Sequence, residues 1–280
     1  MRTIHTDSIT QAIKEMCIQV NHVLSDDMVS CLDRAAAEET DPVGNAVLSQ
    51  LQENLKVAES ERIPICQDTG MAVVFMEIGQ DVHIEGAALT EAVNEGVRQG
   101  YTEGYLRKSV VGDPLIRVNT KDNTPAILHI SIVPGDKIKI TLAPKGFGSE
   151  NMSRIFMLKP AQGEEGVRNA VIEAVRDAGP NACPPVVVGV GVGGTFEKAA
   201  LMAKHALTRK AGTHSELEHI RKMEEELLSE INSLGIGPGG LGGKTTAFAV
   251  NIETFSTHIA GLPVAVNICC HVNRHISREL

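Results

Sequence analysis

A proline and a glycine enclose four polar side chains in residues 64–70 (Pro-Ile-Cys-Gln-Asp-Thr-Gly), where the backbone has little freedom. Pro64 disfavours helix at the residue before it, and Gly70 permits a turn that a side chain would obstruct. The apolar residues 71–76 follow at once and predict a strand over residues 72–78. Loops held between rigid elements commonly carry chemistry, although this heptad alone also fits a turn with one small buried thiol.

Helical spacing of apolar residues predicts a helical region from residue 8 to about residue 60. Later helices are predicted at residues 89–98, 164–177 and 215–233, and after the glycine-rich stretch 191–195.

Strands are predicted at residues 186–190, 247–252 and 264–269. Residues 127–133 and 137–142 alternate between apolar and polar side chains around Pro-Gly-Asp, which predicts a β-hairpin. We therefore expect a mixed α/β (α+β) fold. In it a helical N-terminal lobe, residues 1–62, packs on lobes of mixed β-sheet and helices, with the site in loops at the lobe junction. Residues 1–280 are expected to form one catalytic domain.

The composition argues against several classes of partner. The chain has a net charge of -9 and a pI near 5.6, which disfavours nucleic acid and anionic membranes as ligands. It has no tryptophan, 2 tyrosines and 6 phenylalanines, too few aromatics for base stacking. No apolar signal region or membrane-spanning run is present in the sequence. Six cysteines without regular spacing indicate a reducing cytoplasm rather than a secreted disulfide framework.

Two glycine-rich stretches resemble nucleotide-binding motifs only in part. Residues 189–194 match G-x-G-x-x-G, but the acidic strand end expected about 20 residues later is replaced by the basic, polar stretch 209–214. Gly243-Lys-Thr resembles the end of a P-loop, but a charged helix precedes it instead of a strand. Neither motif predicts a nucleotide site.

Three cysteines lie in loops rich in proline or glycine, or at a strand end. They are Cys66, Cys183 in Asn-Ala-Cys-Pro-Pro, and one of the pair Cys269 and Cys270. A structural zinc site favours paired C-x-x-C ligands, which are absent, and a thiol nucleophile needs a histidine that would select one cysteine. Three dispersed thiolates suit an iron–sulfur cluster that leaves one iron open. Spacing alone leaves these alternatives open. Cys17 and Cys31 lie in helical patterns and are expected in the core.

Four motifs in order resemble class I fumarate hydratases. They are Pro-x-Cys-Gln-Asp-Thr-Gly, Lys-Gly-x-Gly-Ser-x-Asn at 145–151, Ala-Cys-Pro-Pro, and a Pro-Val ending with Cys-x-x-x-Arg. The resemblance runs from about residue 10 to the C-terminus. It is strongest to the alpha subunit of the two-subunit form, with a relation to L(+)-tartrate dehydratase alpha subunits.

The resemblance implies a 4Fe–4S cluster with three cysteine ligands and one open iron. The implied ligands are Cys66, Cys183 and Cys270. Gln67, Asp68 and His258 are implied as catalytic, and the residues implied to bind substrate are Gln67, Asp68, Arg107, Lys145, Gly146, Gly148, Ser149 and Asn151. Without the motif match, Arg107 would be a surface cation and His258 a structural histidine. Likewise, Asp68 would hydrogen-bond its own turn and Lys145 would mark a strand exit.

The implied reaction is reversible trans hydration of fumarate to (S)-malate, a step of the tricarboxylic acid cycle, with the open iron as Lewis acid. L(+)-tartrate dehydration is the alternative, and a non-catalytic iron–sulfur or zinc-binding protein is a further one. In this family a swivelling domain supplies further arginines, a lysine and a threonine. That domain is not recognised here, so we expect a beta subunit to carry it. The expected assembly is a heterotetramer of two alpha and two beta subunits, active on a small dicarboxylate only when complete.

Overall fold

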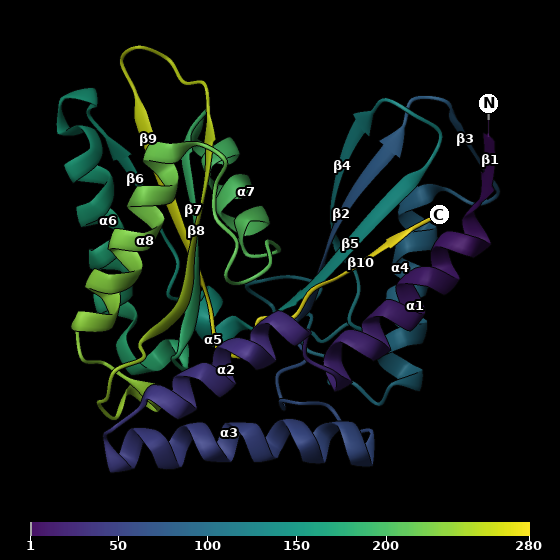
Figure 1. Ribbon diagram of the computed structural model, residues 1–280. Coiled ribbons are helices and arrows are strands. Elements are labelled where there is room, and N and C mark those ends of the chain that lie inside the picture. Colours follow the sequence, from purple (N-terminus) through teal and green to yellow (C-terminus); the bar gives the residue numbers. More distant parts are fainter. Residues whose placement is uncertain (1) are drawn as a thin grey trace. The chain divides into compact units, whose positions relative to one another are not determined.

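The computed structural model describes residues 2–280, and its helices and strands confirm the mixed α/β class (Figure 1). The helices are α1 (Thr6–His22), α2 (Asp26–Glu38), α3 (Pro42–Glu61), α4 (Leu89–Glu103), α5 (Phe147–Glu150), α6 (Gly163–Ala178), α7 (Phe196–Ala206) and α8 (Glu218–Ser233). The strands are β1 (Arg2–His5), β2 (Met71–Gly79), β3 (Val82–Glu85), β4 (Ile127–Val133), β5 (Ile138–Lys145), β6 (Arg154–Leu158), β7 (Val186–Gly193), β8 (Ala247–Phe255), β9 (Leu262–Cys269) and β10 (Ile276–Glu279). No helix in the described residues has the length and apolar character that a bilayer crossing requires.

The chain divides into two compact units, which we describe separately. Unit 1 comprises the chain up to Ser25, Leu55–Phe147 and Arg274–Leu280. Unit 2 comprises Asp26–Asn54 and Gly148–Asn273. The helices expected in residues 1–62 are present, and this stretch contributes to both units. That residues 1–280 act as one catalytic domain stays a prediction.

Unit 1 contains a four-stranded sheet in the order β10-β5-β2-β4. The predicted hairpin of β4 with β5 is wrong, because β2 lies between them, parallel to β4 and antiparallel to β5. The largely buried β2 needs a partner on each edge, and α4 supplies the crossover that a parallel β2–β4 pair requires. The Pro-Gly-Asp turn consequently crosses the end of β2, where the Asp81 amide donates to the Gly135 carbonyl at 2.9 Å.

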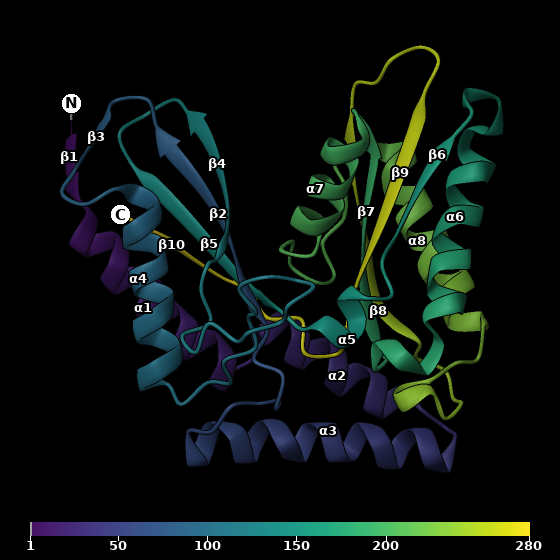
Figure 2. The ribbon, with the colours of Figure 1, turned by 180° about the vertical axis from the view of Figure 1, so that it is seen from behind.

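Helices α1 and α4 lie side by side on one face of this sheet (Figure 2). Two glycines of α4 allow the close approach. A Cβ on Gly96 would lie 2.8 Å from the Cβ of Ile13, and one on Gly100 would lie 2.7 Å from that of Cys17. The core of unit 1 therefore forms between the apolar faces of α1 and α4 and those of β2 and β5.

Unit 2 contains a second four-stranded sheet, in the order β6-β9-β7-β8, with β7 parallel to β8 and antiparallel to β9. Helices α6 and α8 cover one face and α7 covers the other (Figure 1). Val186, Val188 and Val190 point toward α6 and α8, because side chains alternate along a strand.

The glycines that resembled a dinucleotide motif serve this packing. A Cβ on Gly189 would lie 2.2 Å from the Ala203 carbonyl oxygen, and one on Gly191 would lie 2.1 Å from that of Ala199. Both acceptors belong to α7, so glycine lets the helix backbone rest directly on β7. The motif is thus explained by helix packing.

Candidate functional site

The Cys66 loop in unit 1 is a turn that only glycine can close. Gly70 has a φ of 75°, and a Cβ there would lie 2.8 Å from backbone atoms of Lys145. The start of the loop is tied to α1, because the Ile65 amide donates to the Asn21 carbonyl at 2.9 Å. The heptad and the start of the 145–151 loop are therefore packed backbone to backbone.

Asp68 joins these two loops through both of its carboxylate oxygens. Oδ1 accepts from the Gly70 amide at 2.9 Å, so Asp68 does hydrogen-bond its own turn. Oδ2 accepts from the Phe147 amide at 2.9 Å, across 79 positions of sequence. A Cβ on Gly146 would lie 3.1 Å from Oδ2, so the glycine leaves room for the carboxylate. The structure thus brings Asp68 together with the first half of the 145–151 loop.

The Cys66 sulfur lies at the half-buried edge of this turn. It accepts a hydrogen bond from the Asp68 amide at 3.4 Å, and its thiol donates to Gln67 Oε1 at 3.3 Å. Hydrogen bonds to sulfur tune cluster ligands. The geometry is therefore suitable for a thiolate ligand.

Three buried side chains that the motifs did not mark as site residues hold the turn. The Tyr101 hydroxyl donates to the Thr69 carbonyl at 2.8 Å, and Asn123 Nδ2 donates to that of Gly70 at 3.1 Å. Arg274 Nη2 donates to the Asp68 carbonyl at 2.7 Å. Arg274 closes the Cys-x-x-x-Arg ending and Tyr101 is one of 2 tyrosines, but neither fact predicts these long-range bonds.

Two cations lie beside the turn in unit 1. The Arg107 backbone is fixed, because its amide donates to Thr69 Oγ1 at 3.0 Å. Its guanidinium is exposed and forms no hydrogen bond or ion pair within residues 2–280. Lys145 is buried, and its Nζ donates to the Gly146 carbonyl at 3.1 Å. Arg107 thus offers a positive charge to a ligand.

Cys183 and Cys270 come together in unit 2. Cys183 precedes β7 and Cys270 follows β9, and the antiparallel pairing of these strands places both at one end of the sheet. The His271 amide lies 3.3 Å from the Cys183 carbonyl oxygen, and His271 Nδ1 lies 3.1 Å from it. Cys183 is exposed and has a left-handed φ of 53°.

The second half of the 145–151 loop reaches the same end of the unit 2 sheet. Ser153 Oγ accepts from the Ile268 amide at 3.2 Å, just before the end of β9. Asn267 Nδ2 donates to Glu150 at 2.8 Å. Unit 2 therefore gathers four predicted site residues besides Cys183, namely Gly148, Ser149, Asn151 and Cys270.

His258 lies at the other end of this sheet. It is exposed in the connection between β8 and β9 (Figure 1), where its Nδ1 accepts from the Ala260 amide at 3.2 Å. Because β9 leads from this connection to Cys269, the structure does not bring His258 to Cys183 or Cys270. Its catalytic role stays a prediction.

The six cysteines divide by exposure. Cys17, Cys31 and Cys269 have exposed fractions of 0%, 3% and 3%. Cys66 and Cys270 are half-buried and Cys183 is exposed. In the described residues, no three His, Cys, Asp or Glu side chains are grouped as ligands of a single metal ion.

Comparison with known proteins identifies the family. A model of the family described as fumarate hydratase (fumerase) matches residues 10–279. The putative L(+)-tartrate dehydratase subunit alpha of Methanocaldococcus jannaschii is 40% identical over 278 residues, covering 97% of each chain. The L(+)-tartrate dehydratase subunit alpha of Escherichia coli strain K12 is 29% identical over 272 residues, covering 96% of this chain and 89% of the relative. The chain therefore belongs to the fumarate hydratase (fumerase) family, as its motifs indicated.

Proposed function

We propose that this chain is the cluster-binding alpha subunit of a hydro-lyase that reversibly hydrates fumarate to (S)-malate. The observation that carries the proposal is the turn around Asp68. It holds a cysteine, a carboxamide and a carboxylate against the Lys145 loop, beside the unpaired Arg107 guanidinium. Family membership supplies the reaction class.

The residues fit a 4Fe–4S cluster held by Cys66, Cys183 and Cys270. These are the three cysteines that are not buried, whereas the other three are enclosed in the core. The amide that donates to the Cys66 sulfur would also tune a bound cluster. When bound, such a cluster with one open iron would supply Lewis-acid chemistry.

The remaining groups would bind the dianionic substrate and handle its proton. Arg107 can clamp a carboxylate through paired hydrogen bonds, which gives an acidic chain a local positive charge. Lys145 would contribute a positive charge. Gly146 and Gly148 would let backbone amides approach the substrate. Asp68 would orient or relay the proton transfer, with Gln67 beside it.

L(+)-tartrate is the second candidate substrate, because both relatives described above carry that name. We favour fumarate because the 145–151 loop reads Lys-Gly-Phe-Gly-Ser-Glu-Asn, close to the Lys-Gly-Gly-Gly-Ser-Ala-Asn of fumarases. Tartrate enzymes carry Cys-Thr in place of Ser-x and lack the lysine. A site without a partner for a second hydroxyl rejects it, since burying an unmatched hydroxyl is costly.

A beta subunit is part of the proposal. The relatives are named alpha subunits. On unit 1 the apolar side chains Leu115, Ile116 and Val118 are exposed, as expected of a surface that a partner covers. We propose a heterotetramer of two alpha and two beta subunits in the cytoplasm, where thiol ligands stay reduced.

The test is anaerobic reconstitution of the chain with its partner, followed by assays on fumarate, (S)-malate and L-tartrate. We expect faster turnover of fumarate and malate than of tartrate. Arg107→Met should raise the KM, and Lys56→Met, at an exposed cation of the same unit, should not. Faster turnover of L-tartrate would reject fumarate as the substrate. No hydro-lyase activity from a cluster-loaded complex would reject the reaction class.

A further inference from the structure

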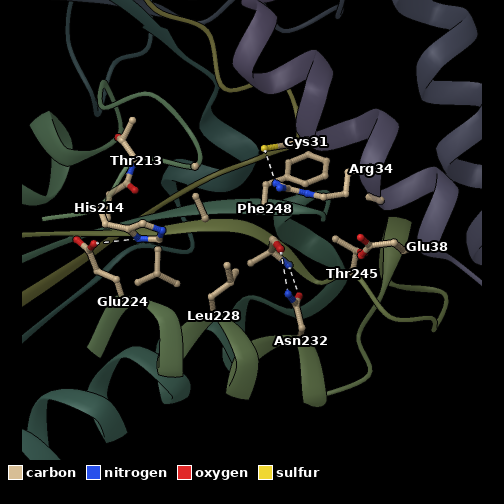
Figure 3. Close-up of a pocket in the computed structure, with 16 residues that line it drawn as sticks. Cys31, Arg34, Glu38, Thr213, His214, Glu224, Leu228, Asn232, Thr245 and Phe248 are labelled. Carbon is tan, nitrogen blue, oxygen red and sulfur yellow. Dashed lines mark hydrogen bonds and ion pairs between the residues drawn. The ribbon is translucent and has the colours of Figure 1, made fainter. Parts of the chain in front are cut away.

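Unit 2 contains a cavity of about 320 Å³ between α2, β8, α8 and the loop at residues 212–214 (Figure 3). This volume is at the lower end of the range for small-molecule sites. None of the predicted ligand, substrate or catalytic residues lines it. Its role is therefore separate from the roles assigned above.

Arg34 of α2 lines the cavity at an exposed position, and its guanidinium has no ion-pair partner within residues 2–280. Glu38 lies four residues later on the same helix, at the usual spacing for an ion pair, but no pair forms. Within residues 2–280 the guanidinium forms one hydrogen bond, from Nη2 to Cys31 Sγ at 3.5 Å (Figure 3). Burial raises the pKa of the Cys31 thiol, so this sulfur is a neutral acceptor and does not balance the charge.

Three other polar side chains of the cavity, those of Glu224, Asn232 and Asn251, have partners within unit 2. The buried Glu224 carboxylate pairs with Arg209 and accepts from the Ile252 amide at 2.7 Å. Asn232 Oδ1 accepts from the Ala247 amide at 2.8 Å, and Asn251 Nδ2 donates to the Ala206 carbonyl at 2.9 Å. These groups fix the walls of the cavity, whereas Arg34 retains donors for a ligand.

The floor of the cavity is the unpaired edge of β8, the last strand of its sheet. The Ile252 amide points away from β7, because it donates to Glu224 of α8. Backbone groups two residues apart on a strand face the same way, so the Val250 amide also faces this edge. Val250 is buried and lines the cavity. A buried donor at such a place calls for an acceptor.

The walls restrict the kind of acceptor. Phe248, Leu228 and Ala249 present apolar surface, which suits a short hydrocarbon chain. The carboxylates of Glu38 and Glu224 also line the cavity and disfavour a second negative charge on the ligand. A planar carboxylate matches the fork of a guanidinium.

We propose that this cavity binds a small organic monocarboxylate. Its carboxylate lies on the Arg34 guanidinium and its alkyl chain lies against Phe248 and Leu228. The site does not depend on the hydro-lyase activity, since every residue that forms it lies within unit 2 and outside the cysteine motifs.

The test follows the methyl NMR signals of Leu228 and Val250 in the full 280-residue chain during titration with isovalerate. We expect saturable shifts of both signals and much weaker binding of isovaleramide, which has the same shape without the charge. Arg34→Met should raise the Kd at least about tenfold, as loss of a charge-assisted hydrogen bond predicts. Arg176→Met, at an exposed position of α6, should leave the Kd unchanged.

Three results would overturn the proposal. One is the absence of saturable shifts at millimolar isovalerate. A second is equal binding of isovaleramide, or binding that persists in Arg34→Met, because the carboxylate would then not be recognised. The third is tighter binding of succinate than of isovalerate at the same two methyl signals, which would assign the cavity to dicarboxylates.

Discussion

The hydroxyl of Tyr101 lies 2.8 Å from the carbonyl oxygen of Thr69 and 3.0 Å from that of Gly70, so one buried phenol holds the turn that presents Cys66 and Asp68. Burial raises the pKa of Tyr101, which keeps the phenol protonated and able to donate. Without the Tyr101 hydroxyl, the Gly70 carbonyl would still accept from Asn123. The Thr69 carbonyl would lose its side-chain donor. The turn thus depends on a residue of α4.

Tyr101→Phe should destabilise the protein by about 1–3 kcal/mol, because a buried carbonyl loses its donor while the packing is kept. Urea unfolding of the purified chain measures this. Tyr105→Phe is the matched control, since Tyr105 is 90% exposed and should change the free energy of unfolding by less than about 0.5 kcal/mol. Equal effects of the two substitutions would contradict an anchoring role.

Acid should weaken the interactions of Asp122, which precedes the turn-holding residue Asn123. Asp122 is partly buried, which raises its pKa, but hydrogen bonds from Thr124 and Arg98 outweigh burial and lower the pKa to about 2. The ordinary value, 3.8, applies to the unfolded chain. The folded pKa is the lower one, so the stabilisation is full above about pH 4 and is lost as the pH falls toward about 2.

Asp122→Asn should therefore cost about 2 kcal/mol near neutral pH and progressively less between about pH 4 and pH 2. Unfolding free energies of the two proteins across this range measure the difference. Asp177→Asn, at an exposed position near the end of α6, is the matched control and should change the free energy of unfolding by less than about 0.5 kcal/mol. A difference that stayed constant with pH would refute the assignment.

Periodic patterns of apolar residues correctly predicted individual helices and strands. The buried run at 186–190 became β7, and the charged amphipathic stretch at 215–233 contains α8, because each pattern records the burial of its own residues. The order of the strands in the sheet of unit 1 was predicted wrongly. The alternation around Pro134 fits a hairpin, yet the choice of β2 as the neighbour of β4 depends on a strand over 50 residues earlier.

The site shows the same limit. The motifs indicated the polar residues of the candidate site, whose roles stay predictions, but gave no sign of the side chains that anchor them. Arg274 and Asp68 are 206 positions apart, and Tyr101 and Thr69 are 32 apart. In each pair the acceptor is a main-chain carbonyl, which every residue possesses, so the identity of the acceptor residue gives no signal of the contact.

Substitution should separate the two adjacent cysteines at the end of β9. Cys269 has an exposed fraction of 3%, whereas Cys270 is half-buried beyond the strand. Cys269 is thus enclosed in the core, whereas the sulfur of Cys270 is accessible to a ligand, as is that of the exposed Cys183. We expect Cys270→Ser to lose the cluster and Cys269→Ser to keep it. Iron and acid-labile sulfide counts measure this, and equal iron content would refute the choice of Cys270.

Asp68→Asn should keep the cluster and lower turnover, because it changes a proton-handling group and removes no thiolate. The structure adds a second effect. The two amides donate to different oxygens of Asp68, and an asparagine places an NH2 group at one of these positions, so a modest loss of stability should accompany the change. Cluster absorbance and fumarate turnover, measured on one preparation, separate the outcomes. Loss of the absorbance would make Asp68 a structural residue.

The isolated chain should be inactive even with its cluster bound. A dianionic substrate needs a cation for each carboxylate and an acceptor for its C3 proton. In the proposed site Arg107 and Lys145 contribute positive charge, and in the resembling family further cations, with the proton-moving threonine, come from the swivelling domain. Closure of that domain would also exclude water and strengthen each electrostatic contact. Fumarate hydration should therefore be negligible with the alpha chain alone and should saturate at one beta subunit per alpha. Iron and sulfide counts on both preparations control for cluster loss, and full activity without the partner would reject the two-subunit proposal.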